Sequence, residues 1–229
     1  MKQQFWKMAF RRQCSLRSTD QGFHESLIHK GGGIRQAAGP AGNTYFDPIL
    51  EHNNVSKKYK GYCDDIFTDA ALDFIGKNKD KPLFAYIATN LPHLPLQVPD
   101  ERAEPYRIQG LHEDNALLYG MIDNIDYNVG RVLDKLKELG IEDNTIVIFL
   151  SENGPSHKRT KNDSYSGRYV ANLRGTKTSV YENGVRVKSG TSVDNINDFV
   201  KFWNRFTSQY FWRAKLFQCF LFNFSTTVG

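Results

Sequence analysis

Residues 114–155 read DNALLYGMIDNIDYNVGRVLDKLKELGIEDNTIVIFLSENGP, and this stretch decides the fold because it holds a helix and a strand in succession. Apolar residues first recur every three to four positions, which predicts an amphipathic helix over 113–139 that stops at Gly140. The run TIVIFL at 145–150 then predicts a buried strand.

A second helix and strand precede this pair in the chain. Residues 64–76 (DDIFTDAALDFIG) carry an approximate helical stripe of apolar side chains. Asp64 and Asp65 suit the start of that helix, where carboxylates meet the positive end of its dipole, better than they suit a metal pair. PLFAYIAT at 82–89 predicts another buried strand. The order helix, strand, helix, strand predicts an α/β fold with a central β-sheet flanked by helices.

Composition narrows the class of protein. The chain has 229 residues, 40% of them hydrophobic and 24% charged, which fits one α/β domain or two small ones and excludes a disordered or fibrous chain. The net charge of +5 is spread out and favours small anionic substrates over nucleic acid. Three widely separated cysteines (Cys14, Cys63 and Cys219) indicate neither a disulfide framework nor a CxxC metal site.

The sequence shows no targeting segment or membrane span. Its first twenty residues carry positive charge but lack the apolar core of a signal peptide. No stretch approaches the roughly 18 to 20 apolar residues that a membrane helix needs. These observations leave the compartment undetermined.

Polar residues follow both predicted strands, where ligands of α/β sheets usually bind. His93 stands in a Pro-stiffened loop, NLPHLPLQ, after the first strand; the alternative is an ordinary surface histidine. Glu152 and Asn153 follow the second strand and offer the hard oxygen donors that Ca²⁺ and Mg²⁺ accept. The alternative there is a plain turn in which Asn153 bonds to its own backbone.

A later segment, LRGTKTSVYENGVRV at 173–187, places Arg174, Lys177 and Arg186 among small residues. Such cations can bind an oxyanion by charge-assisted hydrogen bonds, and a solvated loop is the competing interpretation. Lys177 is the strongest candidate of the three, because its compact ammonium acts as a point charge on a tetrahedral anion.

Several separated motifs, in one order, resemble the central part of the type I sulfatases of the alkaline-phosphatase-like superfamily. The resemblance implies a partial sulfatase domain at 18–187, incomplete on its N-terminal side, between a non-matching segment at 1–17 and a divergent, aromatic-rich tail at 188–229. The motifs are STDQGF (18–23), GYCDDIFTDAALDFI (61–75), KPLFAYIATNLPHLPLQVP (81–99), the stretch 114–155 and LRGTKTSVYENGVRV (173–187).

What the resemblance implies is a sulfuric ester hydrolase with a Ca²⁺ site, acting on a sulfated small molecule or sulfated glycan and not on nucleic acid. Glu152 and Asn153 match the family's second metal pair, with Glu in place of the usual Asp. His93 matches the sulfate-contacting histidine of a P-H-x-P loop, and Lys177 matches the sulfate-contacting lysine of an L-R-G-x-K segment. Family members are commonly exported, periplasmic or lysosomal.

The departures from the family pattern concern the reactive centre. The chain has no C/S-x-P-x-R string, because Cys14 is followed by Ser-Leu-Arg, and the family's early Asp pair is missing. No catalytic nucleophile is therefore assigned, and we expect negligible turnover by this chain alone. Two alternatives stay open: a non-catalytic module that binds sulfated ligands, and a phosphoester hydrolase of the same superfamily. Loss of the nucleophile strand is expected to leave a central sheet edge unpaired.

Overall fold

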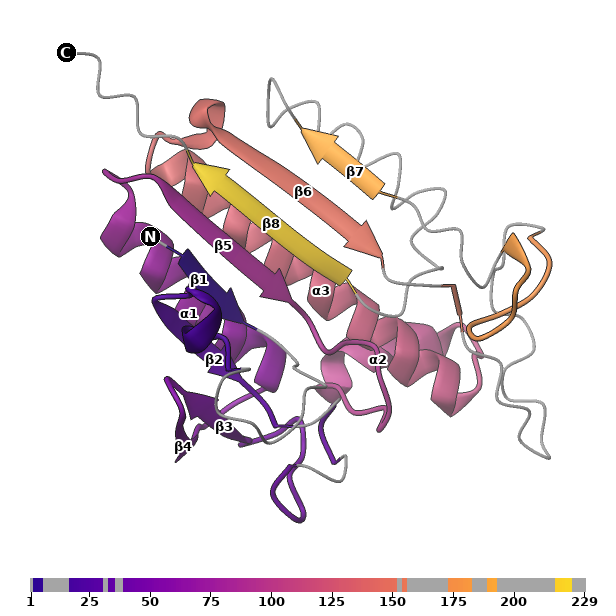
Figure 1. Ribbon diagram of the computed structural model, residues 1–229. Helices are drawn as coiled ribbons and strands as arrows, with labels where there is room; N and C mark the ends of the chain where they lie inside the picture. The colour runs from indigo at the N-terminus through magenta and orange to yellow at the C-terminus, as the bar shows by residue number, and fades with distance from the viewer. Residues whose placement is uncertain are drawn as a thin grey trace.

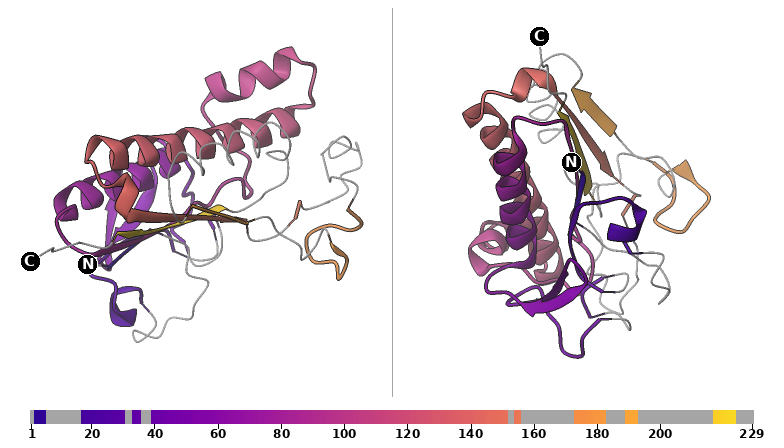
Figure 2. Two further views of the ribbon diagram at one scale, coloured as in Figure 1. Left: turned by 90° about the horizontal axis from the view of Figure 1, so that it is seen from above. Right: turned by 60° about the vertical axis from the view of Figure 1, so that its left-hand side comes forward.

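A computed structural model describes residues 2–5, 17–30, 33–35, 39–151, 154–155, 173–182, 189–192 and 217–223 of the chain. Within them, eight strands form one sheet in the order β4-β3-β2-β1-β5-β8-β6-β7. The helices lie together on one face of this sheet (Figures 1 and 2). The described residues therefore form an α/β sheet flanked by helices, as the sequence predicted.

The elements have the following bounds. The strands are β1 Lys2–Phe5, β2 Glu25–Ile28, β3 Ile49–His52, β4 Val55–Lys58, β5 Leu83–Ala88, β6 Thr145–Ser151, β7 Ser189–Ser192 and β8 Phe217–Asn223. The helices are α1 Cys63–Asn78, α2 Asp100–Ile108 and α3 Glu113–Glu138, with short 3₁₀ turns at Thr19–Gln21 and Glu142–Asn144. All four predicted elements are confirmed, as α1, β5, α3 and β6.

The core lies between the sheet and the helices α1 and α3. It is built by the apolar stripes that the sequence showed, and burying each such side chain contributes on the order of 1.5–3 kcal/mol. The left-handed Gly140, with φ of 65°, ends the turn after α3, and its N–H donates to the carbonyl of Lys137 at 3.0 Å. Core side chains with almost no exposed surface include Phe67, Ile75, Met121, Leu136 and Phe149.

The two acids at the start of α1 lie in its first turn, as predicted, but they bond to other elements. The N-cap position, Tyr62, provides no side-chain cap. The carboxylate of Asp65 accepts hydrogen bonds from the amide groups of Asn124 and Asn128 on α3, at 2.9 and 2.8 Å. These bonds hold α1 against α3. The helix dipole, which was all that the sequence indicated for these acids, did not predict this packing role.

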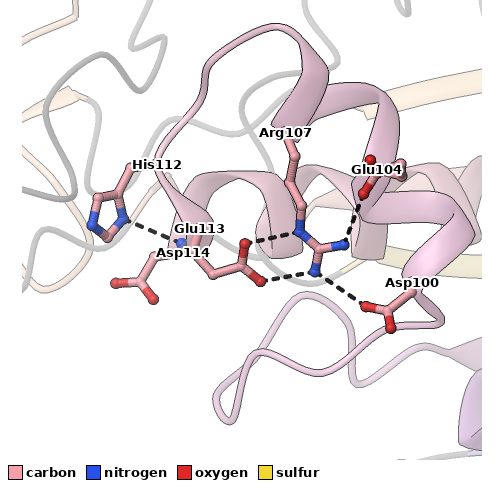
Figure 3. Close-up of polar contacts among 6 residues, drawn as sticks. All are labelled: Asp100, Glu104, Arg107, His112, Glu113 and Asp114. Atoms are coloured by element: carbon pink, nitrogen blue, oxygen red, sulfur yellow. Dashed lines mark hydrogen bonds and ion pairs between the residues drawn. The ribbon is translucent and has the colours of Figure 1, made fainter.

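Helices α2 and α3 form a hairpin that packs closely. A Cβ atom at Gly120 would lie 2.9 Å from the backbone of Arg102, so glycine is needed for this approach. Arg107 of α2 joins the two helices by its ion pair with Glu113 of α3, and it also pairs with Asp100 and Glu104 of its own helix (Figure 3). The same figure shows Nδ1 of His112 accepting from the N–H of Asp114 at 3.3 Å, which caps α3.

The direction of the strands positions the candidate site. β5 and β6 are both antiparallel to β8, so they run in the same direction. Ala88 and Leu150 both lie opposite Gln218 in this register. The ends of β5 and β6 are therefore level and two strand spacings, roughly 10 Å, apart. β1 and β2 run parallel to β5, so they end at the same edge.

The expectation of an unpaired central edge is wrong for the described residues. β8, from the tail that sequence analysis left without a counterpart, lies between β5 and β6 and pairs with both (Figure 1). Its sequence, FQCFLFN, is rich in the aromatic residues that suit strands. Pairing satisfies the backbone N–H and C=O groups that both neighbouring strands would otherwise leave without partners.

Candidate functional site

The site is built at the edge where β5 and β6 end, and both arrowheads point to this edge in Figure 1. The chain leaves β5 into residues 89–97, here called the His93 loop. It leaves β6 into Glu152–Pro155. This arrangement is the one expected of a ligand site in an α/β sheet.

His93 is half-buried and held from within its loop. Its N–H donates to the carbonyl of Asn90 at 3.0 Å, and two X-Pro bonds, Leu91–Pro92 and Leu94–Pro95, are cis. Nδ1 lies 2.8 Å from the carbonyl oxygen of Leu94. Because a carbonyl can only accept, Nδ1 carries a proton, and Nε2 holds the lone pair of the neutral ring.

A buried carboxylate anchors the start of the His93 loop. Asp64 on α1 has 4% of its surface exposed, and it accepts hydrogen bonds from the hydroxyl of Thr89 and the backbone N–H of Asn90. The Thr89 oxygen in turn accepts from the N–H of Leu91 at 2.9 Å. Burial raises the pKa of Asp64 to about 7, with Asp65 adding to the rise and the two hydrogen bonds opposing it.

Two buried tyrosines hold the rest of the loop. The hydroxyl of Tyr45 accepts from the side-chain amide of Asn90 and donates to the carbonyl of His93 at 3.0 Å. Tyr62, whose ring stacks on that of Tyr45 at 6.0 Å, donates to the carbonyl of Gln97 at 2.7 Å. Desolvation raises the pKa of both hydroxyls well above the usual value, so both are neutral donors.

Sequence reasoning missed this network of Tyr45, Tyr62, Asp64 and Asn90. Asn90 gave a usable signal, because an amide directly after a buried strand must find partners. Tyr45 gave none, since it stands in an irregular segment 45 residues before Asn90.

A small cavity lies under the sheet beside Asp64. Its volume is about 20 Å³, and its lining includes Asp64, Thr68, Thr89 and Asn128 among apolar side chains. One water molecule needs roughly 10–15 Å³ measured in this way, so the cavity has room for one.

Lys177 is half-buried and tied to the chain that leaves β6. Its N–H donates to the carbonyl of Pro155 at 2.9 Å. Gly175 sets the preceding turn with φ of 90°, and a Cβ atom there would lie 2.4 Å from Oγ of Ser179. Arg174 instead covers the ring of Tyr181, with its guanidinium carbon 3.9 Å from the ring centre. The backbone of Lys177 is thus held by Pro155, four residues after the end of β6.

The predicted metal pair, Glu152 and Asn153, lies outside the described residues, as does Arg186. The pair directly follows the buried Ser151 and precedes Pro155, which holds Lys177. Across the part of the chain that the structure describes, no three His, Cys, Asp or Glu side chains gather closely enough for a metal ion. The side-chain oxygens of Glu152 and Asn153 are of the type that Ca²⁺ binds, but the ion needs six to eight oxygen ligands, so this pair alone cannot hold it.

The described thiol of Cys63 does not supply a nucleophile. It is 1% exposed, and burial raises its pKa well above the usual value, with Asp64 and Asp65 adding to the rise. Cys14 lies outside the described residues.

Among the described residues, no helix is both long and apolar enough to cross a lipid bilayer.

Comparison with known proteins identifies the family. The Sulfatase family model matches residues 4–188. An uncharacterized sulfatase of Escherichia coli (strain K12), YdeN, is 36% identical over 119 residues, which are 50% of this chain and 21% of that protein. The N-acetylgalactosamine-6-O-sulfatase of Bacteroides thetaiotaomicron is 33% identical over 132 residues, which are 54% of this chain and 24% of the relative.

A solved structure shows the same fold. The crystal structure of Ps i-CgsB in complex with k-i-k-neocarrahexaose aligns with a TM-score of 0.70 and 25% identity, covering 82% of this chain and 44% of that one. This chain thus spans less than half of the solved protein and about a quarter or less of the two relatives. The match over 4–188, together with the shared fold, shows that this chain belongs to the sulfatase family.

Proposed function

We propose that this chain is the part of a sulfate-ester hydrolase that binds the sulfuryl group of the substrate. The observation that carries the proposal is that β5 and β6 end level at one edge of the sheet, with His93 in the loop after β5 and the backbone of Lys177 bonded to Pro155, four residues after β6. His93 as imidazolium, which donates through Nε2 because Nδ1–H is bound to Leu94, and the ammonium of Lys177 would each give a charge-assisted hydrogen bond to a sulfuryl oxygen.

Hydrolysis also needs a nucleophile, and the sequence contains no C/S-x-P-x-R string. We therefore propose that the 229-residue chain binds sulfate esters and turns them over negligibly. The same observation favours the second candidate function, a non-catalytic module for sulfated ligands. Binding and turnover must be measured separately to distinguish the two functions from an inert chain.

Calorimetry with 4-nitrophenyl sulfate tests binding. Lys177→Ala and His93→Ala should each weaken binding, whereas Lys79→Ala, at an exposed position after α1, should leave it unchanged. Equal heats from all four proteins would count against the proposal. Rapid release of 4-nitrophenol by the unmodified chain would refute the proposed lack of turnover, and 4-nitrophenyl phosphate in parallel tests the phosphoester alternative.

The natural ligand is proposed to be a sulfated glycan. A relative is named an N-acetylgalactosamine-6-O-sulfatase, and the solved neighbour was crystallised with k-i-k-neocarrahexaose. Titration with N-acetylgalactosamine 6-sulfate and with the unsulfated sugar tests this class. Equal affinity for the two sugars would argue against recognition of the sulfate.

Ca²⁺ is the proposed cofactor, and when bound it would neutralise negative charge on the substrate. Glu152 and Asn153 would contribute two of its oxygen ligands, because they stand directly after β6. Calorimetric titration with Ca²⁺ should give a weak signal that Glu152→Gln with Asn153→Ala abolishes. An unchanged signal in the double variant would remove the pair from the site.

A further inference from the structure

A compact segment of the chain, residues 45–64, holds the His93 loop. Three groups between residues 45 and 64 reach it: the hydroxyl of Tyr45, the hydroxyl of Tyr62 and the carboxyl group of Asp64. They contact the loop at its middle, its end and its start, respectively. Of these three groups, the hydroxyl of Tyr45 is the one that bonds to His93 itself, at 3.0 Å from its carbonyl oxygen.

The hydroxyl of Tyr45 has three polar neighbours, the side-chain amide of Asn90 and the carbonyl oxygens of His93 and Asn90 at 3.0 and 3.4 Å, so the carbonyl of His93 is the nearer acceptor. The hydroxyl accepts a hydrogen bond from the side-chain amide of Asn90 and donates to the carbonyl of His93. Asn90 has no exposed surface and Tyr45 has 1%. Water therefore cannot replace either partner easily, and the carbonyl of His93 keeps this donor.

The position of this carbonyl controls the imidazole ring through the next residue. Because a peptide unit is planar, fixing the carbonyl of His93 fixes the plane that joins His93 to Leu94. Leu94 precedes a proline, which restricts its backbone angles. The carbonyl of Leu94 is thereby directed at Nδ1 of His93, 2.8 Å away.

We propose that Tyr45 is a positioning residue: its hydroxyl sets the backbone at His93 so that Nδ1–H is bound to Leu94, and Nε2 is the nitrogen that takes up a second proton and, as imidazolium, donates to a sulfuryl oxygen. This inference rests on the proposed function for the role of Nε2. The effect of Tyr45 on the ring is independent of that function. Tyr45 itself touches no substrate.

The ¹⁵N resonances of the histidine rings test the inference in the full 229-residue chain at about pH 8, where an ordinary imidazole is neutral. His93→Gln identifies the resonances of His93. In the unmodified chain, Nδ1 should give the signal of the protonated nitrogen. Tyr45→Phe should shift the ring toward the Nε2–H tautomer, because the carbonyl of His93 is no longer held.

Tyr62→Phe is the matched control, because it removes an equally enclosed hydroxyl whose 2.7 Å bond goes to Gln97. It should leave the tautomer of His93 unchanged. An unchanged tautomer in Tyr45→Phe, or an equal shift in both variants, would overturn the inference. If Tyr45→Phe does not fold, Asn90→Ser provides the same test, because it removes the amide that bonds to the Tyr45 hydroxyl. It should also shift the ring of His93 toward the Nε2–H tautomer.

Titration of the same proteins with 4-nitrophenyl sulfate separates the two ideas. If the unmodified chain does not bind the ester, the proposed function fails, and the tautomer still decides the role of Tyr45. If the ester binds and Tyr45→Phe leaves the tautomer intact, only the inference fails. Below about pH 6, where an ordinary imidazole is protonated, weaker binding by Tyr45→Phe than by Tyr62→Phe is the expected result.

Discussion

Replacing Asp64 by Asn should remove a large pH dependence of stability. Asp64 is buried beside the sheet, and burial is the main reason that its pKa is raised from 3.8 to about 7. An asparagine keeps an acceptor for the Thr89 hydroxyl and the Asn90 N–H. Its amide protons can bond to a water molecule in the adjoining cavity, which has room for one.

The sign of the effect follows from proton binding. Between pH 4 and pH 7, the folded chain keeps the proton on Asp64 while the unfolded chain releases it, so stability falls as pH rises through about 7. With an unfolded pKa of 3.8 and a folded pKa of about 7, the free energy of unfolding drops by roughly 2.5 kcal/mol from pH 5 to pH 8. Asp64→Asn lacks this contribution.

Urea unfolding of the unmodified chain and of Asp64→Asn, at several pH values between 5 and 8, measures the contribution of Asp64 to the free energy of unfolding. Other groups titrate equally in both chains, so the difference between the two free energies isolates Asp64. That difference should move by roughly 2.5 kcal/mol in favour of Asp64→Asn as pH rises. Asp80→Asn, at an exposed turn, should show no such trend. Parallel pH profiles for Asp64→Asn and the unmodified chain would refute the reasoning.

Three further predictions concern Gly175, Glu113 and β8. Gly175→Ala should weaken binding of 4-nitrophenyl sulfate in calorimetry. It should also lower the free energy of unfolding by more than the roughly 1–3 kcal/mol of backbone strain, because the new Cβ meets Ser179. Gly22→Ala has the same φ of 90° but no neighbouring atom within 4 Å, so it should cost only the strain. Arg107 lowers the pKa of Glu113, so their pair stabilises above that pKa and is lost as pH falls through it. Glu113→Gln should therefore cost about 0–1 kcal/mol in urea unfolding at pH 7 and nothing in strong acid, since the pair is exposed. Truncation after residue 216 removes β8 and should cause aggregation in light scattering, which truncation after Asn223 should not.

Local patterns were enough to predict the elements that carry the site. The period of apolar residues located α1 and α3, and uniform apolar runs located β5 and β6. The placement of His93 beyond a strand end followed from the α/β order alone. These predictions succeeded because each depends on neighbours that are close in sequence.

The parts that could not be predicted depend on distant contacts. FQCFLFN favours a strand by composition, but nothing local to it selects β5 and β6 as neighbours. Asp64 looked like a helix-start acid, yet its partners are Thr89 and Asn90 at the end of β5. Such pairings follow from the packing of the whole domain, and the sequence gives no periodic signal for them.

The same long-range contacts explain why binding could persist without catalysis. The groups that orient His93 all come from residues 45–97, a part of the chain that the structure describes continuously. None of them requires a nucleophile, and the hydrogen bonds that fix Nδ1 are complete within this segment. Lys177 is likewise fixed by its own turn and by Pro155. Anion-contacting groups that are set by their supporting residues keep their geometry when the reactive group is lost, so we expect affinity for sulfate esters to survive in a chain that cannot cleave them.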